Sequence, residues 1–259
     1  MLYMDKIISS KDNKIYKELV KLNQKKYRDE MGKYLVEGEN LLFEAIRYGH
    51  LIDKVILRED AAFTYGMKTA TYKLSHNLFS QVAGTKTSQG VMAVIKKKVT
   101  GISDFGRLCD AKDNLVVLDR LQDPGNIGTV IRTAEGAGYR GVICIRGTAD
   151  VYSPKVVRAA AGALFRVPIL YISSTDELFE LVKKLNKKLT VSILEGDYKY
   201  YNVDLKERVV LVIGNEGNGC SAEIVEAADC RVTIPMAGEL ESLNAAVAAG
   251  ILMYEAVRQ

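Results

Sequence analysis

The sequence predicts an α/β protein with two domains, and three features carry that prediction. Apolar strand-like segments alternate with helical segments, glycine-rich loops follow several of the strands, and basic residues are concentrated in the first part of the chain. The 259 residues are 48% hydrophobic and 26% charged, which is ordinary globular composition with enough apolar residues for one or two cores.

Residues 1–98 are predicted to form a small α/β domain of usual size. Apolar residues at helical spacing predict helices at 13–32, 39–50 and 74–84, the first ending at Gly32. Short apolar runs between them predict strands, which lie at 33–38, 52–59 and 89–97. The next segment is mixed and polar, and we expect a linker at 99–112.

Residues 113–259 are predicted to form a second domain around a parallel sheet. Continuous apolar strands alternate with helices there, which is typical of a parallel sheet covered on both faces. The predicted strands lie at 114–119, 141–145, 167–172, 190–196, 208–214 and 229–235. The predicted helices lie at 129–138, 153–164, 174–188, 221–228 and 242–257.

Composition excludes several classes of protein. No apolar run reaches the length of a membrane span, and the first residues lack the apolar stretch and cleavage site of a signal peptide. The four cysteines are widely spaced and there are only two histidines. This argues against a disulfide framework, a zinc site or a histidine-based catalytic centre. We therefore expect a cytoplasmic protein with reduced thiols and no metal centre.

The charge distribution is uneven along the chain. Residues 1–107 hold 19 Lys and Arg against 12 Asp and Glu, a net charge of +7, whereas residues 108–259 hold 17 against 20, a net charge of −3. A basic first part joined to a mildly acidic remainder is typical of a polyanion-binding module attached to a second function. A solvated lysine surface explains the charge equally well.

One glycine pattern has the wrong context for a dinucleotide site. Gly136, Gly138 and Gly141 spell G-x-G-x-x-G, but they follow a helix and precede a strand, whereas the fingerprint needs the reverse order. We interpret them as a helix end and a tight turn.

Three other loops, which start after residues 119, 213 and 234, follow strands of the same sheet. Ligands of open parallel sheets bind at the edge formed by the carboxyl ends of the strands. These loops predict a cofactor site with the substrate beside it.

The three loops also resemble a known family. "DPGNIGTVIRTAEGAG", "LVIGNEGNG" and "VTIPMAGELESLNAAVAAGILMYE" resemble, in order and spacing, the three motifs of the SpoU–TrmH family of RNA 2′-O-ribose methyltransferases. "KYLVEGENLLFEAI" and "SQGVMAVI" resemble the substrate-binding domain of that family, which is related in fold to a ribosomal protein. The resemblance implies S-adenosylmethionine as methyl donor, RNA as partner, a deep trefoil knot in the second domain and a homodimer formed through it.

The resemblance also assigns site residues. The implied catalytic residues come from all three motifs and are Asn126, Arg132, Glu216, Ser242 and Asn244. The implied cofactor-binding residues come from the second and third motifs and are Gly214, Asn215, Gly217, Ile234, Met236, Ser242, Leu243 and Asn244. Asn215 departs from the family, which often has serine there, so the role of that side chain is open. From the sequence alone, Asn126 and Ser242 are also good candidates for helix N-caps.

Arg132 is the ionisable group best placed to act on a ribose hydroxyl, and two roles are open. Either Arg132 acts transiently as a base, or it stays charged, holds the neighbouring RNA phosphate and lowers the pKa of the hydroxyl. We favour the second role because a neutral arginine at pH 7 costs about 7–9 kcal/mol. A structural arginine paired with Glu135 or Glu216 is the third interpretation, and a carboxylate of Glu216 that bridges Arg132 and Asn126 is a further one.

The function predicted from these features is methyl transfer to a ribose 2′-OH, with 23S ribosomal RNA favoured as substrate. Three alternatives remain: a transfer RNA 2′-O-methyltransferase, a non-catalytic RNA-binding protein of the same fold, and a nucleotide-dependent oxidoreductase. A non-catalytic protein predicts a missing motif residue, and Asn126, Arg132, Glu216, Ser242 and Asn244 are all present. The misplaced glycines argue against the oxidoreductase.

Overall fold

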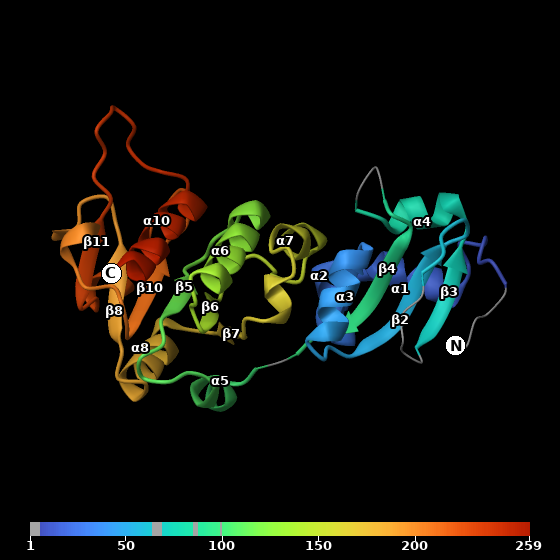
Figure 1. Ribbon diagram of the computed structural model, residues 1–259, viewed down its shortest axis with the longest axis horizontal. Coiled ribbons are helices and arrows are strands. Elements are labelled where there is room, and N and C mark those ends of the chain that lie inside the picture. The colour runs from blue at the N-terminus through green and yellow to red at the C-terminus, as the bar shows by residue number, and fades with distance from the viewer. Residues whose placement is uncertain (1–5, 64–68, 85–87, 99) are drawn as a thin grey trace. The chain divides into compact units, whose positions relative to one another are not determined.

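The computed structural model describes residues 6–63, 69–84, 88–98 and 100–259 (Figure 1). The chain divides into two compact units, and each of them is built from two separate segments of the sequence. The first unit combines Met1–Lys98 with Asp150–Phe165, and the second combines Val99–Ala149 with Arg166–Gln259. In the ranges described, no helix is both long and apolar enough to cross a membrane.

The first unit contains a four-stranded sheet in the order β1-β4-β2-β3. β4 (Val91–Lys96) pairs antiparallel with both β1 (Lys33–Glu37) and β2 (Ile52–Arg58), and β2 pairs parallel with β3 (Ala70–Leu74). The predicted strands at 33–38, 52–59 and 89–97 are confirmed. β3 was not predicted, because only two of its five residues are buried and it has no continuous apolar run.

The predicted helix at 13–32 is two helices, α1 (Lys14–Leu22) and α2 (Lys25–Met31). The single-helix prediction was wrong because Gln24 adopts an extended conformation and breaks the helix, while left-handed Gly32 ends α2 as predicted. The other two predicted helices are confirmed as α3 (Glu39–Arg47) and α4 (His76–Val82). The core of this unit packs the apolar faces of α1 and α4 on the sheet, and its largest members include Leu19, Leu22, Ile56, Phe79 and Met92.

A segment from the middle of the chain completes the first unit. It contains α7 (Pro154–Ala159) and the short 3₁₀ helix η1 (Ala163–Phe165). Asp150 forms a buried ion pair with Arg28 at 2.7 Å, and the Tyr152 ring lies 4.8 Å from that of Tyr34 between centroids. Segment 150–165 is therefore built into this unit, although the residues on both sides of it belong to the second unit.

The second unit contains a seven-stranded sheet in the order β7-β6-β5-β10-β8-β11-β9, and every neighbouring pair is parallel. The prediction of a parallel sheet is thus confirmed. The strands are β5 (Leu115–Leu118), β6 (Gly141–Ile145), β7 (Ile169–Ile172), β8 (Lys188–Ser192), β9 (Tyr198–Lys199), β10 (Val209–Ile213) and β11 (Cys230–Thr233). β9 was not predicted, because its two residues are exposed at the sheet edge.

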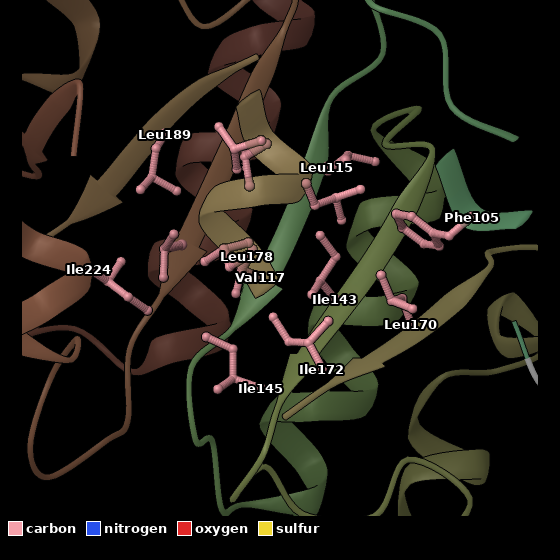
Figure 2. Packing of buried hydrophobic residues seen from close by; sticks show 14 of the residues in the cluster. Phe105, Leu115, Val117, Ile143, Ile145, Leu170, Ile172, Leu178, Leu189 and Ile224 are labelled. Atoms are coloured by element: carbon pink, nitrogen blue, oxygen red, sulfur yellow. The ribbon is translucent and has the colours of Figure 1, made fainter. Parts of the chain in front are cut away.

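Helices cover both faces of this sheet. Figure 2 shows one face, where α5 (Ile102–Leu108), α8 (Thr175–Lys184) and α9 (Ala222–Glu226) contribute Phe105, Leu178 and Ile224 to a buried cluster with the strands. α6 (Pro124–Gly136) and α10 (Ala245–Arg258) lie side by side on the other face (Figure 1).

Helix α5 lies inside the segment predicted as a linker. It is fixed by one fully buried residue, Phe105, and a Cβ on Gly141 would overlap the Phe105 ring. The glycine at the start of β6 therefore lets α5 pack directly against the strand.

Candidate active site

A cavity of about 670 Å³ opens where β8, β10 and β11 end, at the carboxyl edge of the sheet. Its walls come from the loops after these three strands and from the start of α10. The residues predicted to bind cofactor all line it: Gly214, Asn215, Gly217, Ile234, Met236, Ser242, Leu243 and Asn244. Glu216 also lines the cavity, whereas Asn126 and Arg132 are not among its lining residues.

The glycine loop after β10 folds back on itself. Asn215 and Gly219 exchange two backbone hydrogen bonds of 2.9 Å, and a Cβ on Gly214 would collide with the backbone of Gly219 and Cys220. Inside this turn the Asn215 Oδ1 atom accepts the backbone N–H of Gly217 at 3.0 Å, while Asn215 Nδ2 donates to the carbonyl of Arg120 at 2.8 Å. The Asn215 side chain, which departs from the family pattern, therefore shapes the loop and ties it to the end of β5.

A buried carboxylate anchors the far end of the same loop. Asp119, fully buried after the last residue of β5, accepts hydrogen bonds from the backbone N–H of Ser221 at 2.6 Å and from its hydroxyl at 2.8 Å. Sequence analysis did not single out Asp119. The available signal was an acidic residue directly after a fully apolar strand, at the edge where ligands bind.

Glu216 joins the second motif to the first. Its carboxylate accepts the backbone N–H groups of Gln122 and Asp123, both at 3.1 Å, and the Nδ2 group of Asn126 at 3.0 Å. Partial burial raises the pKa of Glu216, but the hydrogen bonds from Asn126 and the backbone outweigh burial and hold the pKa below its ordinary value. Glu216 is therefore a deprotonated acceptor that already holds three hydrogen-bond donors.

Asn244 joins the third motif to the same group. Its Nδ2 atom donates to Asn126 Oδ1 at 2.9 Å, and its Oδ1 atom accepts the backbone N–H of Ala246 at 2.9 Å. Asn244 is thus the N-cap of α10, and the prediction that Ser242 caps this helix was wrong, because the chain becomes helical only at Ala245. The result is a chain of side chains, Glu216–Asn126–Asn244, that links all three motifs.

The start of α6 also differs from the prediction. Asp123 is the N-cap, and its Oδ1 atom accepts the backbone N–H of Asn126 at 2.8 Å. The prediction of Asn126 as N-cap was wrong, because Pro124 takes the first helical position and places the cap one residue before it. This leaves the Asn126 side chain free to join Glu216 and Asn244. As expected, Gly136 ends α6 and Gly138 adopts a positive φ of 76° in the turn before β6.

Arg132 has an exposed side chain on α6 and no ion pair or hydrogen bond within the described residues. Glu135 pairs instead with Arg166 at 2.7 Å, and Glu216 is occupied by Asn126 and the backbone. Two interpretations were therefore wrong. Arg132 is not a structural arginine paired with Glu135 or Glu216, and Glu216 does not bridge Arg132 and Asn126. The guanidinium of Arg132 is available to an anionic ligand.

The cavity suits a nucleoside-type cofactor. Its volume lies within the range of about 300–1,000 Å³ that is usual for small-molecule sites. Ile234, Met236 and Leu243 offer an apolar surface for a flat ring, and the loop from Gly214 to Gly219 brings backbone groups close to the opening. Amide and hydroxyl groups of Asn244 and Ser242 line the same cavity and can hold polar ends of a ligand.

Known proteins share this architecture over nearly the whole chain. An S-adenosylmethionine-bound rRNA methyltransferase from Sinorhizobium meliloti superimposes with a TM-score of 0.88 at 32% identity, covering 98% of this chain and 97% of that one. The 23S rRNA (guanosine(2553)-2′-O)-methyltransferase RlmP of Bacillus subtilis is 34% identical over 97% of this chain and 98% of its own. The 23S rRNA (uridine(2479)-2′-O)-methyltransferase of Streptomyces viridochromogenes is 31% identical over 97% of this chain and 92% of its own.

Fold and site together define the class as an RNA 2′-O-methyltransferase with an added substrate-binding domain. The sequence pattern of the SpoU rRNA Methylase family matches residues 113–254, and that of the MRM3-like substrate binding domain matches residues 13–93. The chain belongs to the SpoU rRNA Methylase family. The family predicted from the three motifs is thus confirmed.

Proposed function

We propose that this protein transfers a methyl group from S-adenosylmethionine to a ribose 2′-OH of 23S ribosomal RNA. The observation that carries the proposal is the cavity at the sheet edge, walled by the second and third motifs and linked to the first by the Glu216–Asn126–Asn244 chain. S-adenosylmethionine supplies the electrophilic methyl group when bound. Gly214, Ile234, Met236 and Leu243 would hold its adenosine part.

The residues of the chain divide the remaining work. Glu216 orders the backbone of Gln122 and Asp123, and because its pKa is held below the ordinary value it is a weak base for the proton of the ribose hydroxyl. Arg132 is exposed and unpaired in the described part of the chain, so it can hold an RNA phosphate and favour the alkoxide electrostatically. The hydrogen bond between Asn126 and Asn244 holds the start of α6 against the start of α10.

Ribosomal RNA is the proposed substrate class because two relatives of similar identity are named for 23S rRNA, one for a guanosine and one for a uridine.

We assign RNA binding to residues 1–98 and methyl transfer to residues 113–259. One side of α1 supports this assignment: Lys14, Lys17 and Lys21 are exposed, opposite the buried Leu19 and Leu22. A row of lysines on one helix face can bind successive phosphates.

We further propose a homodimer formed through the second unit and a deep trefoil knot within it. The outer side of α10 supports a dimer, since Val247, Tyr254 and Val257 are each 51–56% exposed and follow one another at helical spacing. The strand order supports the knot, since β10 inserts between β5 and β8, which precede it in the chain. Cytoplasmic location follows from the proposed ribosomal substrate.

Methyl transfer from labelled S-adenosylmethionine tests the function. Unmodified 23S rRNA and transfer RNA are offered separately to the wild type, to Arg132→Ala and to Arg107→Ala, a control in an exposed pair on α5. We expect alkali-stable label in 23S rRNA, lost only in Arg132→Ala. Label confined to transfer RNA would replace the substrate, and cofactor binding with no transfer to either RNA or to ribosomal particles would indicate a non-catalytic RNA-binding protein.

A mixing experiment tests whether the dimer shares its sites. Arg132→Ala and Gly214→Ala are each expected to be inactive, the second because a Cβ collides with the loop backbone. Arg132 does not line the cavity of its own chain, so in a shared site it completes the cavity of the partner subunit. Refolding the two variants together should then restore part of the activity, whereas sites confined to one subunit give none.

A further inference from the structure

Arg120 has an unusual backbone beside the proposed active site. It follows Asp119 after β5 and adopts a φ of 59°, in the left-handed region that a residue with a long side chain rarely occupies. Its N–H donates to Thr148 Oγ1 at 3.2 Å, and its carbonyl accepts Gln122 Nε2 at 3.0 Å and Asn215 Nδ2 at 2.8 Å. These bonds join the loops after β5, β6 and β10 and hold the strained residue in place.

The surroundings of Arg120 position its side chain but leave both Nη groups of its guanidinium without a partner among the described residues. A Cβ on Gly147 would lie 3.1 Å from Arg120 Cγ, so the glycine makes room for the arginine stem. Nε donates to the buried carboxylate of Asp119 at 3.0 Å, which fixes the plane of the group. The side chain is 42% exposed, and its two Nη atoms have no partner in the described ranges.

Arg120 is connected through Gln122 to Glu216, which holds the loop before α6. Gln122, which bonds the Arg120 carbonyl, also donates its backbone N–H to Glu216. Arg120 is not among the residues that line the cavity, so its free Nη groups are available to a ligand other than the cofactor. Two parallel N–H donors of an arginine match two oxygens of a phosphate. We infer that Arg120 binds a backbone phosphate of the RNA next to the target ribose; this rests on the proposed function and adds a binding residue to it.

Arg120→Gly gives a sharp test, because it removes the guanidinium and relaxes the backbone at the same time. Arg208→Gly is the matched control, since Arg208 also has a positive φ of 66° but lies before β10, at the opposite end of the strand, and bonds the carbonyl of Asn186. For Arg120→Gly we expect a melting temperature close to that of the wild type, because the relaxed backbone offsets the lost hydrogen bond to Asp119, together with an unchanged Kd for S-adenosylmethionine and at least a tenfold higher KM for RNA. The dependence of log affinity on log salt should fall by about 0.7–0.9, the value for one phosphate contact.

Arg208→Gly should leave the KM for RNA within twofold of wild type, and Arg120→Lys should recover part of the affinity. The inference is overturned if Arg120→Gly keeps the wild-type KM for RNA, if Arg208→Gly raises it equally, or if Arg120→Gly weakens the cofactor instead. Failure of the proposed function is a separate result, namely no methyl transfer by the wild type. In that case the affinity of the same variants for a 23S rRNA fragment still decides the role of Arg120.

Discussion

Replacing Glu216 by glutamine tests the electrostatic link between the first two motifs. Glutamine keeps one oxygen, which can still accept Asp123 N–H and Asn126 Nδ2, but its amide group then faces the N–H of Gln122, donor against donor. A hydrogen bond to a charged group contributes about 1.5–3 kcal/mol. Because Glu216 is exposed and water can replace a lost partner, we expect a smaller loss of unfolding free energy, about 1 kcal/mol.

The pH dependence gives this prediction a second, independent readout. The pKa of Glu216 in the folded state lies below its ordinary value of 4.5, so its stabilisation is fully present above that value and is lost as the pH falls through the folded pKa. Urea unfolding of the wild type and Glu216→Gln should therefore differ by a constant amount between pH 6 and 8, and the difference should shrink below about pH 4.5.

Methyl transfer should fall together with stability, because the backbone from Gln122 to Asn126 loses its anchor. We expect at least a tenfold lower kcat/KM at pH 7, with most of the loss in RNA-dependent steps. Glu226→Gln is the control, since that exposed carboxylate on α9 has no side-chain partner among the described residues. A Glu216→Gln protein with wild-type stability and activity, or a difference in unfolding free energy that persists in acid, would refute the reasoning.

Substitutions at three further positions test the hydrogen bonding of individual side chains. Asn244→Ala should lose about 1 kcal/mol of unfolding free energy with the cap of α10, whereas Asn244→Asp should retain it, and equal losses in urea unfolding would contradict the capping role. Tyr139→Phe should raise the melting temperature slightly, because the buried hydroxyl has no hydrogen-bond partner in the described structure; a clear loss of stability would mean that it has one. Lys187→Met should cost about 2–3 kcal/mol in urea unfolding, because its Nζ donates to three carbonyls at 2.5–3.2 Å, and a neutral result would show that these carbonyls find other donors.

The strands of the second unit could be predicted because most are buried on both faces and so consist of continuous apolar residues. Helix α5 could not, because Phe105 is its only buried residue, while its two other large apolar residues, Ile102 and Leu108, are exposed and give no helical pattern. The errors at the starts of α6 and α10 have a common cause. Several polar residues precede each helix, and tertiary contacts decide which one caps it. At α6 the pair Asp123–Pro124 predicts the helix start better than Asn126 does, because proline favours the first helical position and aspartate the N-cap before it.

Eight residues that line the cavity were singled out from motifs, but the hydrogen bonds that connect its loops could not be predicted. Asp119 and Ser221 are separated by 102 residues, and no local pattern indicates that they form a hydrogen bond. The same holds for the loop-shaping role of Asn215, which depends on the carbonyl of Arg120. For Arg132, two carboxylate partners were predicted from the sequence, Glu135 and Glu216. In the structure the first pairs with Arg166 and the second accepts Asn126 and backbone N–H groups.

The inclusion of residues 150–165 in the first unit has a consequence for synthesis and dissection of the protein. A fragment that stops at Lys98 would leave Arg28 without Asp150 and Tyr34 without Tyr152, so it would expose a buried charge and an aromatic surface. On the ribosome, the first unit remains incomplete until Phe165 has emerged, after strands β5 and β6 of the second unit. The two units therefore complete their folding in an interleaved order, and because the chain passes between them three times, no single truncation isolates either one intact.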